Sequence, residues 1–451
     1  MFSRSTLKDV LKLALPAVGE MTLYMLIWVF DTMMVGHYGG KLTVTAVSLS
    51  SETLYTFVNI FIAAGLAVGI TSTVARKYGA KQYDEVQNYA SVALTLSVII
   101  AFVLSTIFFN FPEEILRLAR ADENIIALGS SYIRICSVGL FFHMIMATCN
   151  GVLRGLGNTF IPLVAASIIN AVNVFLDWAL IFGRFGLPEM GVSGAALATA
   201  TAHIVGFLFI MYYINFKLHF KMKLIKFSTL KVQVKDLVKL SIPSGLQEAA
   251  FSICRLINAF MIMVLGSAAF SANSITTAIE SISFMPGYGL AVAATTLVGQ
   301  KYGEKNFEKA QEYIKTCVFL GSVLMGLSAI VFLLIPEVLI RAFIKSTEVE
   351  VIQYGAQCLR LAAIEQIPMA ISMIIGGSLK GIGDTKTPFK IAVFTNWFIR
   401  LPLIYFFIIV NRFPVTFVWM TTAIQWFIDA ALMYVMYKRH FKKVFALQKN
   451  I

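Results

Sequence analysis

Long apolar runs separated by short polar segments organise this chain from end to end. About 20 apolar residues are needed for an α-helix to cross the hydrocarbon core of a bilayer, and twelve runs of this kind occur. The pattern therefore predicts an all-α membrane protein with twelve transmembrane helices. We place them at residues 13–34, 54–75, 90–110, 132–153, 160–182, 194–215, 241–264, 276–298, 316–336, 357–378, 389–410 and 415–437.

Composition supports the same class of protein. Of 451 residues, 58% are hydrophobic and only 14% are charged, whereas a soluble domain carries about 25% charged residues. The five cysteines show no CxxC spacing and no metal-like histidine partners. We expect them to be small apolar packing residues, with neither a disulfide framework nor a zinc site. They are Cys136, Cys149, Cys254, Cys317 and Cys358.

The net charge of +13 is unevenly placed along the chain. Lys and Arg gather in alternate polar segments, and the segments between these hold few. By the positive-inside rule, both termini are expected in the cytoplasm, in a multi-pass protein of the plasma (inner) membrane. The basic residues then lie beside anionic lipid. We therefore expect the lipid bilayer, and not nucleic acid, to be the partner of this charge.

The chain repeats itself once, at a spacing of 224 to 227 residues. Each half then holds six helices. Because six is even, both halves have the same orientation, as parallel repeats about an axis along the membrane normal. We predict two six-helix lobes related by a pseudo-two-fold repeat: an N-lobe (1–215), a basic cytoplasmic linker (216–240) and a C-lobe (241–451). The matching segments are Gly65–Ala90 with Gly289–Ile314, Gly151–Pro162 with Gly377–Pro388, and Pro16 with Pro243.

One predicted helix carries unusual polar residues. Residues 168–180 read IINAVNVFLDWAL, with Asn173 and Asp177 four positions apart and therefore on one helix face. A carboxylate at the bilayer centre costs at least about 2.5–3.5 kcal/mol on insertion scales, so such residues usually face a bundle interior or a water-filled path. This helix is a candidate for binding the ion that drives a transporter.

The repeat provides an internal control on the acids. Asp177 falls opposite Leu403, and Asp31 falls opposite Asn258, so both aspartates are neutral in the other half. A purely architectural role would more readily be kept in both halves. The asymmetry favours a proton or cation site in the N-lobe alone, and the alternative is a structural ion pair in one lobe.

Several segments together resemble a known family. The first predicted helix reads PAVGEMTLYMLIWVFDTMMVGHYG, the fifth contains NVFLD, the sixth opens with GVSGAALAT, and the RGLGNT loop has its repeat in KGIGDT. Over essentially the whole chain this resembles the multidrug and toxic compound extrusion (MATE) family, in particular the prokaryotic branch related to DNA-damage-inducible F proteins. The resemblance implies a V-shaped, two-lobed bundle that exports cationic or amphipathic compounds in exchange for H⁺ or Na⁺.

Carried over by position, that branch's cation site falls on Asp31, Asn173, Asp177 and Thr199. Another branch uses acids in the C-lobe, at positions near Phe251 and Met369, so its site is absent here in the usual form.

Two chemistries suit the N-lobe residues. Two carboxylates in one low-dielectric pocket cannot both ionise cheaply, so the pair is expected to take up a proton. Alternatively, the carboxylates with the amide and hydroxyl oxygens of Asn173 and Thr199 offer hard oxygen ligands to Na⁺. The sequence does not separate the two ions. We expect no cofactor other than this coupling ion, H⁺ or Na⁺.

Other polar residues within the predicted helices have competing interpretations. Asn170, Glu20 and His203 are possible accessory residues: Glu20 lines a substrate path or lies at the water interface, and His203 relays protons or is a hydrogen-bonded packing histidine. For the charged residues within the predicted helices of the C-lobe, internal ion pairing is the simplest interpretation. The alternative is that they form a second cation site or contact the drug. The possible C-lobe and substrate contacts are Glu248, Glu280, Glu365, Arg255, Tyr24 and Met25.

No enzymatic motif is present: the sequence contains no P-loop, HExxH or GxSxG. The first hypothesis is a monomeric secondary active antiporter for multidrug efflux, acting on small cationic or amphipathic substrates by alternating access. The alternative is a flippase for a lipid or oligosaccharide precursor, which would need a strongly cationic cavity. A scaffold or receptor would leave the one-sided aspartate pair unexplained.

Overall fold

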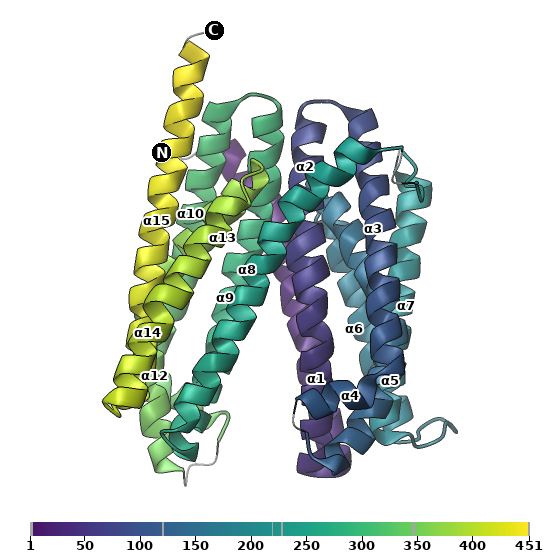
Figure 1. The fold of residues 1–451 in the computed structure, drawn as a ribbon, viewed down its shortest axis with the longest axis vertical. Helices are drawn as coiled ribbons and strands as arrows, with labels where there is room; N and C mark the ends of the chain where they lie inside the picture. Colours follow the sequence, from purple (N-terminus) through teal and green to yellow (C-terminus); the bar gives the residue numbers. More distant parts are fainter. Residues whose placement is uncertain (1–2, 120, 219, 227–228, 345–347, 450–451) are drawn as a thin grey trace. The chain divides into compact units, whose positions relative to one another are not determined.

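The computed structural model describes residues 3–119, 121–218, 220–226, 229–344 and 348–449. Within these residues every regular element is helical, and twelve helical spans are long and apolar enough to cross a membrane (Figure 1). The predicted fold class is therefore confirmed. The spans are Arg4–Gly40, Leu42–Gly79, Tyr83–Asn110, Glu123–Gly155, Phe160–Ile181, Gly191–Lys217, Lys231–Met263, Ser267–Gly303, Phe307–Leu334, Val349–Gly381, Lys386–Val410 and Thr416–Ala446.

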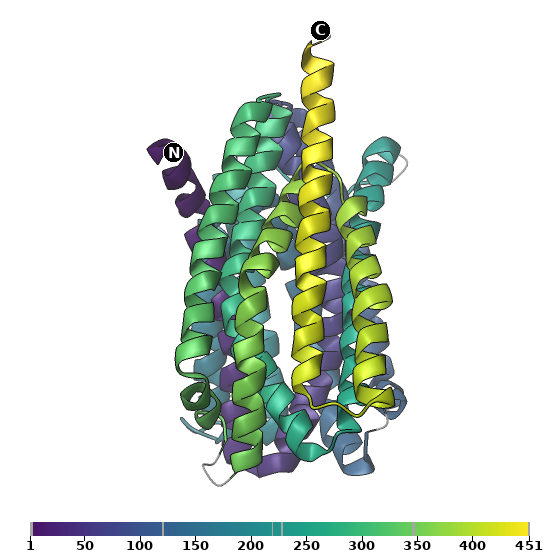
Figure 2. The ribbon, with the colours of Figure 1, turned by 90° about the vertical axis from the view of Figure 1, so that its left-hand side faces the viewer.

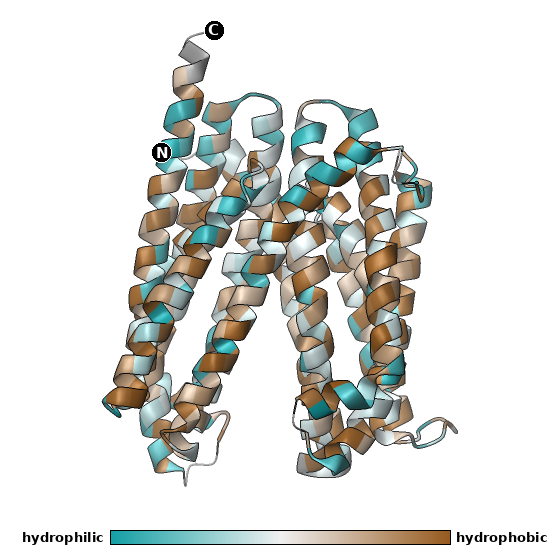
Figure 3. Ribbon diagram, viewed as in Figure 1, coloured by the Kyte–Doolittle hydropathy of each residue, from teal (hydrophilic) through white to brown (hydrophobic). Residues whose placement is uncertain are grey.

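The first half of the chain consists of α1 (Arg4–Val58), the π-helical turn η1 (Asn59–Leu66), α2 (Ala67–Gly79), α3 (Tyr83–Asn110), α4 (Pro112–Leu118), α5 (Glu123–Gly155), α6 (Phe160–Ile181) and α7 (Gly191–Lys217). The second half consists of α8 (Lys231–Met263), α9 (Ser267–Gly303), α10 (Phe307–Leu334), α11 (Pro336–Arg341), α12 (Val349–Gly381), α13 (Lys386–Val393), η2 (Phe394–Arg400), α14 (Leu401–Ile404), η3 (Tyr405–Val410) and α15 (Thr416–Lys449). Hydrophilic residues gather near many helix ends, and apolar residues dominate between them (Figure 3).

The sequence repeat recurs in backbone detail. The turns before α3 and α10 place Lys81 and Lys305, which are 224 positions apart, at φ values of 58° and 60°. The loops after α5 and α12 place Gly157 and Gly383 at φ values of 86° and 94°. Such positive φ values are rare outside glycine, so their recurrence indicates that both halves fold by the same local rules.

Helix packing is repeated as well. Thr71 of α2 donates a hydrogen bond of 2.9 Å to the carbonyl of Gly151 on α5, and Thr295 of α9 donates one of 2.9 Å to Gly377 on α12. A Cβ on Gly377 would lie 2.5 Å from the carbonyl oxygen of Ala291. Small residues at helix crossings let membrane helices approach closely, which explains why both matching segments are rich in glycine.

Most helices extend beyond the apolar runs placed from the sequence, and two of these extensions bear on the interpretation. α1 begins at Arg4, before the expected start at residue 13, so Pro16 lies well inside the helix. α8 begins at Lys231, so part of the predicted linker is helical. Hydropathy marks only the apolar part of a helix, and a lysine-rich stretch can extend it beyond that part. Within α1, Gly40 has a non-helical conformation (φ 67°, ψ −148°) and separates the first two spans.

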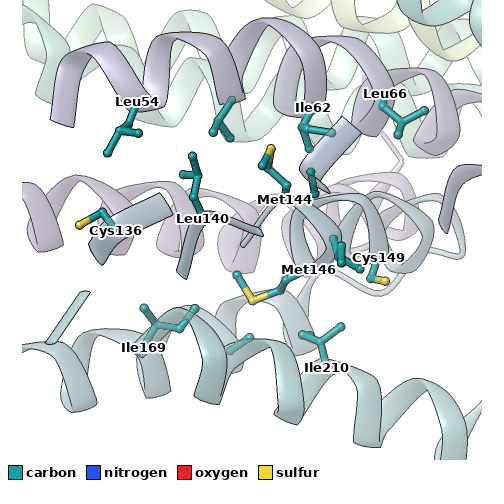
Figure 4. Packing of buried hydrophobic residues seen from close by; sticks show 14 of the residues in the cluster. Leu54, Ile62, Leu66, Cys136, Leu140, Met144, Met146, Cys149, Ile169 and Ile210 are labelled. Carbon is teal, nitrogen blue, oxygen red and sulfur yellow. The ribbon is translucent and has the colours of Figure 1, made fainter. Parts of the chain in front are cut away.

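The described chain forms two compact units, each with its own core. Gly19–Gly245 is the first, and Met1–Val18 with Leu246–Ile451 is the second. The core of the first packs residues of α1, η1, α5, α6 and α7, among them Leu54, Ile62, Leu140 and Met144 (Figure 4). In the second, Val10, Leu13 and Ala14 of α1 join residues of α9, α10, α12 and α15. Figure 2 shows α15 running along this unit beside the segment from α13 to η3.

Candidate cation-binding site

The four predicted site residues come together in the first compact unit. Asp31 is on α1, Asn173 and Asp177 are on α6, and Thr199 is on α7; each is at most 5% exposed. The Asn173 amide donates to the Thr199 hydroxyl oxygen at 3.3 Å. That hydroxyl donates to Oδ2 of Asp31 at 3.2 Å. Residues 168 positions apart in sequence thus form one polar cluster in an apolar bundle.

The two carboxyl groups of the cluster lie within hydrogen-bonding reach of each other. Both side-chain oxygens of Asp177, together with Oδ1 of Asp31 and Oδ1 of Asn173, are buried without a hydrogen-bond donor among the described residues. Carboxylate oxygens are acceptors only, so a hydrogen bond between the two groups requires a proton on one of them. A buried cluster of unpaired oxygens is chemically suited to a shared proton or to a hard cation.

Asn170 contributes differently from its neighbours on α6. Its amide donates to the carbonyls of Leu23 at 3.1 Å and Ala166 at 2.9 Å. The first of these bonds ties α6 to α1 one turn away from the site. Asn170 therefore helps to position the helix that carries Asn173 and Asp177.

Glu20 is fully buried and pairs with Arg154 of α5 at 2.5 Å. Neither interpretation of Glu20 from the sequence included this partner. Arg154 belongs to the RGLGNT motif, which the repeat had singled out for its glycines. In the C-lobe the equivalent Lys380 lies within electrostatic range of Glu248 on α8.

His203 lies one turn after Thr199 on α7, with its ring centroid 4.4 Å from that of His143 on α5. Tyr24 and Tyr55 lie edge-on to His143, at centroid distances of 6.1 and 6.0 Å. Met25 follows Tyr24 on α1 and is partly buried. The sequence did not single out Tyr55, because one tyrosine in an apolar helix carries no distinctive signal.

Two of the C-lobe acids, Glu280 and Glu365, differ from the expected internal ion pairing. No salt bridge within 4.0 Å involves Glu280 or Glu365 in the part of the chain that the structure describes, and the Arg255 guanidinium contacts Ser252 at 3.5 Å. Glu280 and Glu365 instead lie within hydrogen-bonding reach of each other, with Arg400 in electrostatic range. This is a second carboxyl pair, on helices that do not correspond to those of the N-lobe cluster.

Comparison with known proteins agrees with both the repeat and the fold. The MatE family model matches the chain twice, over residues 16–179 and 243–406, so each match begins at one of the two aligned prolines. The chain belongs to the MATE family. It is therefore a multi-pass membrane transporter and not an enzyme.

Relatives of this MATE protein align along most of their length. The probable multidrug resistance protein NorM of Thermotoga maritima is 31% identical, covering 88% of this chain and 84% of the relative. The multidrug resistance protein MdtK of Yersinia pseudotuberculosis is 26% identical, covering 88% and 86%. A solved multidrug resistance MATE family transporter of the MOP superfamily in its outward-facing conformation shares the fold at a TM-score of 0.89 with 22% identity, over 97% of this chain and 96% of that one.

Proposed function

We propose that this protein is a secondary active multidrug efflux antiporter that exports small cationic or amphipathic compounds in exchange for H⁺ or Na⁺. The single observation that carries the proposal is the buried Asp31–Asp177 pair, whose oxygens have too few protein donors. The names of the relatives, which denote multidrug resistance, support the substrate class. The proposed location is the plasma (inner) membrane, with both termini cytoplasmic and the protein acting as a monomer.

Coupling follows from competition between two states of the cluster. An ion bound by Asp31 and Asp177 neutralises negative charge and favours the arrangement of α1, α6 and α7 that holds it. Drug binding favours the arrangement without the ion. A ligand shifts such an equilibrium only by its difference in affinity for the two states, so exchange requires that ion and drug prefer different states.

The pairing of Arg154 with an acid argues against a lipid flippase. Arg154 neutralises Glu20 and so adds no net positive charge of the kind that a pyrophosphate would require. The alternative function gains no support from this lobe.

The test is transport of a cationic dye in proteoliposomes under separately imposed pH and Na⁺ gradients. The proposal expects one gradient to drive uptake in wild type, and expects D31N and D177N to abolish the driven component while both proteins remain folded. D429N is a matched control, since it neutralises a buried acid of α15 outside the cluster. If neither gradient changes the rate of dye uptake, or if both aspartate variants are fully active, antiport through this site is refuted.

A further inference from the structure

His203, which is buried, and His143, which is half-buried, lie between the candidate cation site and the Glu20–Arg154 pair. His203 is 3% exposed, and its ring packs against the rings of His143 and Tyr55. Nδ1 of His143 is buried and has no hydrogen-bond partner among the described residues. A packing histidine normally satisfies its ring nitrogens, because buried polar groups without partners are unfavourable. His143 therefore departs from the hydrogen-bonded packing role.

The polar residues on either side extend the pair in both directions. Tyr55 contacts both imidazoles and lies within electrostatic range of Asp31. Tyr24 contacts His143 and lies within reach of Asn150 and near Glu20 and Arg154. A succession of side chains that can donate and accept protons thus connects the aspartates to the ion pair.

Helix geometry places these groups in order. Glu20, Tyr24 and Asp31 are spaced four and seven apart and share one face of α1. At a rise of 1.5 Å per residue, Glu20 and Asp31 are about 16 Å apart along the helix, too far for direct proton transfer. The imidazoles of α5 and α7 occupy the interval.

We propose that His143 and His203 form a proton relay between the Asp31–Asp177 pair and the Glu20–Arg154 end of the N-lobe. The inference rests on the proposed antiport and specifies H⁺ as its ion. Tyr24, Tyr55 and the partner imidazole are the titratable groups that face the rings.

Proton transfer along this path needs no co-reactant. The carboxyl of the aspartate pair gives its proton through the Tyr55 hydroxyl to the unprotonated ring nitrogen of His203, whose other nitrogen releases a proton to His143. His143 does the same toward Tyr24, and the carboxylate of Glu20, whose Oε2 has no partner, receives the last proton. Each imidazole ends neutral, with its proton on the opposite nitrogen, and rotation of the ring restores the start.

The experiment compares two activities of H143Q, H203Q, the double variant and wild type in proteoliposomes. Glutamine keeps hydrogen-bonding capacity but does not titrate. We expect dye uptake driven by a pH gradient to fall at least about tenfold in the double variant. Exchange of internal for external dye at equal pH, which moves no net protons, should stay within about twofold of wild type. H37Q, at an exposed histidine bonded to the Met33 carbonyl, is the matched control and should change neither.

Y55F supplies an independent test, since it keeps the ring and removes the hydroxyl. It should lower dye uptake driven by a pH gradient and leave dye exchange at equal pH unchanged. This test remains available if the double histidine variant does not fold. Wild-type uptake by the double variant or by Y55F would overturn the relay, and so would an equal loss of both activities, which indicates a structural role. A wild-type protein driven by Na⁺ alone would also overturn it while leaving antiport intact. A wild type that responds to neither gradient would instead refute the proposed function.

Discussion

The guanidinium of Arg154 on α5 lies 2.5 Å from the carboxylate of Glu20 on α1, one helical turn after Pro16. Glu20 is fully buried and the Arg154 side chain is 14% exposed, so each charge depends on the other for neutralisation. The pair holds the helix that carries Asp31 against the helix that carries His143.

Breaking this pair on one side is expected to destabilise the protein strongly. We predict that E20A or R154A lowers the free energy of unfolding by about 3–5 kcal/mol, because each leaves an uncompensated charge in an apolar bundle. The measurement is denaturant or thermal unfolding of the purified protein in detergent.

The double variant E20M/R154M provides the control. Replacing both charges by apolar groups of similar volume removes the unpaired charge, so it should recover much of the loss. If the two single effects simply add in the double variant, the side chains are not energetically coupled.

Thr199 is expected to set the proton affinity of the site through its hydroxyl. T199V removes the hydrogen bond to Oδ2 of Asp31, and bonds to charged groups contribute about 1.5–3 kcal/mol. Because that bond stabilises the unprotonated carboxylate, its loss favours proton binding, and the H⁺ concentration for half-maximal transport should fall by roughly tenfold to a hundredfold. Dye uptake measured over a range of driving-ion concentrations gives this value. T199S keeps the hydroxyl and should resemble wild type. If T199V has the same half-maximal ion concentration as wild type, Thr199 does not belong to the site.

The fold could be predicted from sequence because its signals are local. Each membrane span is marked by its own run of apolar residues, and the glycine segments that bring α2 to α5 recur where α9 meets α12. The helix ends were less predictable, since a lysine-rich extension such as the start of α8 is helical without being apolar.

The candidate site was predictable only in part. The absence of a counterpart for Asp177 in the repeat marked that residue, and the family resemblance supplied Thr199. The pairing of Glu20 with Arg154 and the contact of Tyr55 with two histidines depend on helix packing over more than 80 residues of sequence. Single-helix patterns carry no information on such distant partners.

The glycine contacts between α9 and α12 give a prediction about stability. In G377A the new Cβ would lie 2.5 Å from the Ala291 carbonyl oxygen, so the helices must separate, and overpacking of this kind costs about 1–3 kcal/mol. In the neighbouring G376A the nearest atom is Cε of Met433 at 3.7 Å, an ordinary contact. Thermal unfolding should distinguish the two, and equal midpoints would show that the helix crossing tolerates the extra methyl group.

The second carboxyl pair, Glu280 with Glu365, is expected to influence transport less than the aspartates. Arg400 lies in electrostatic range of both acids, so one negative charge is already balanced, unlike in the Asp31–Asp177 cluster. E365Q removes the other charge while keeping the shape of the side chain. Dye uptake driven by the coupling ion should fall by less than about tenfold, below the range typical of a lost proton-transfer group. R400M is the informative companion, because it leaves both carboxyls without a cation and should lower the thermal midpoint more than E365Q does. A loss in E365Q as complete as in D31N would place a coupling site of equal weight in the C-lobe.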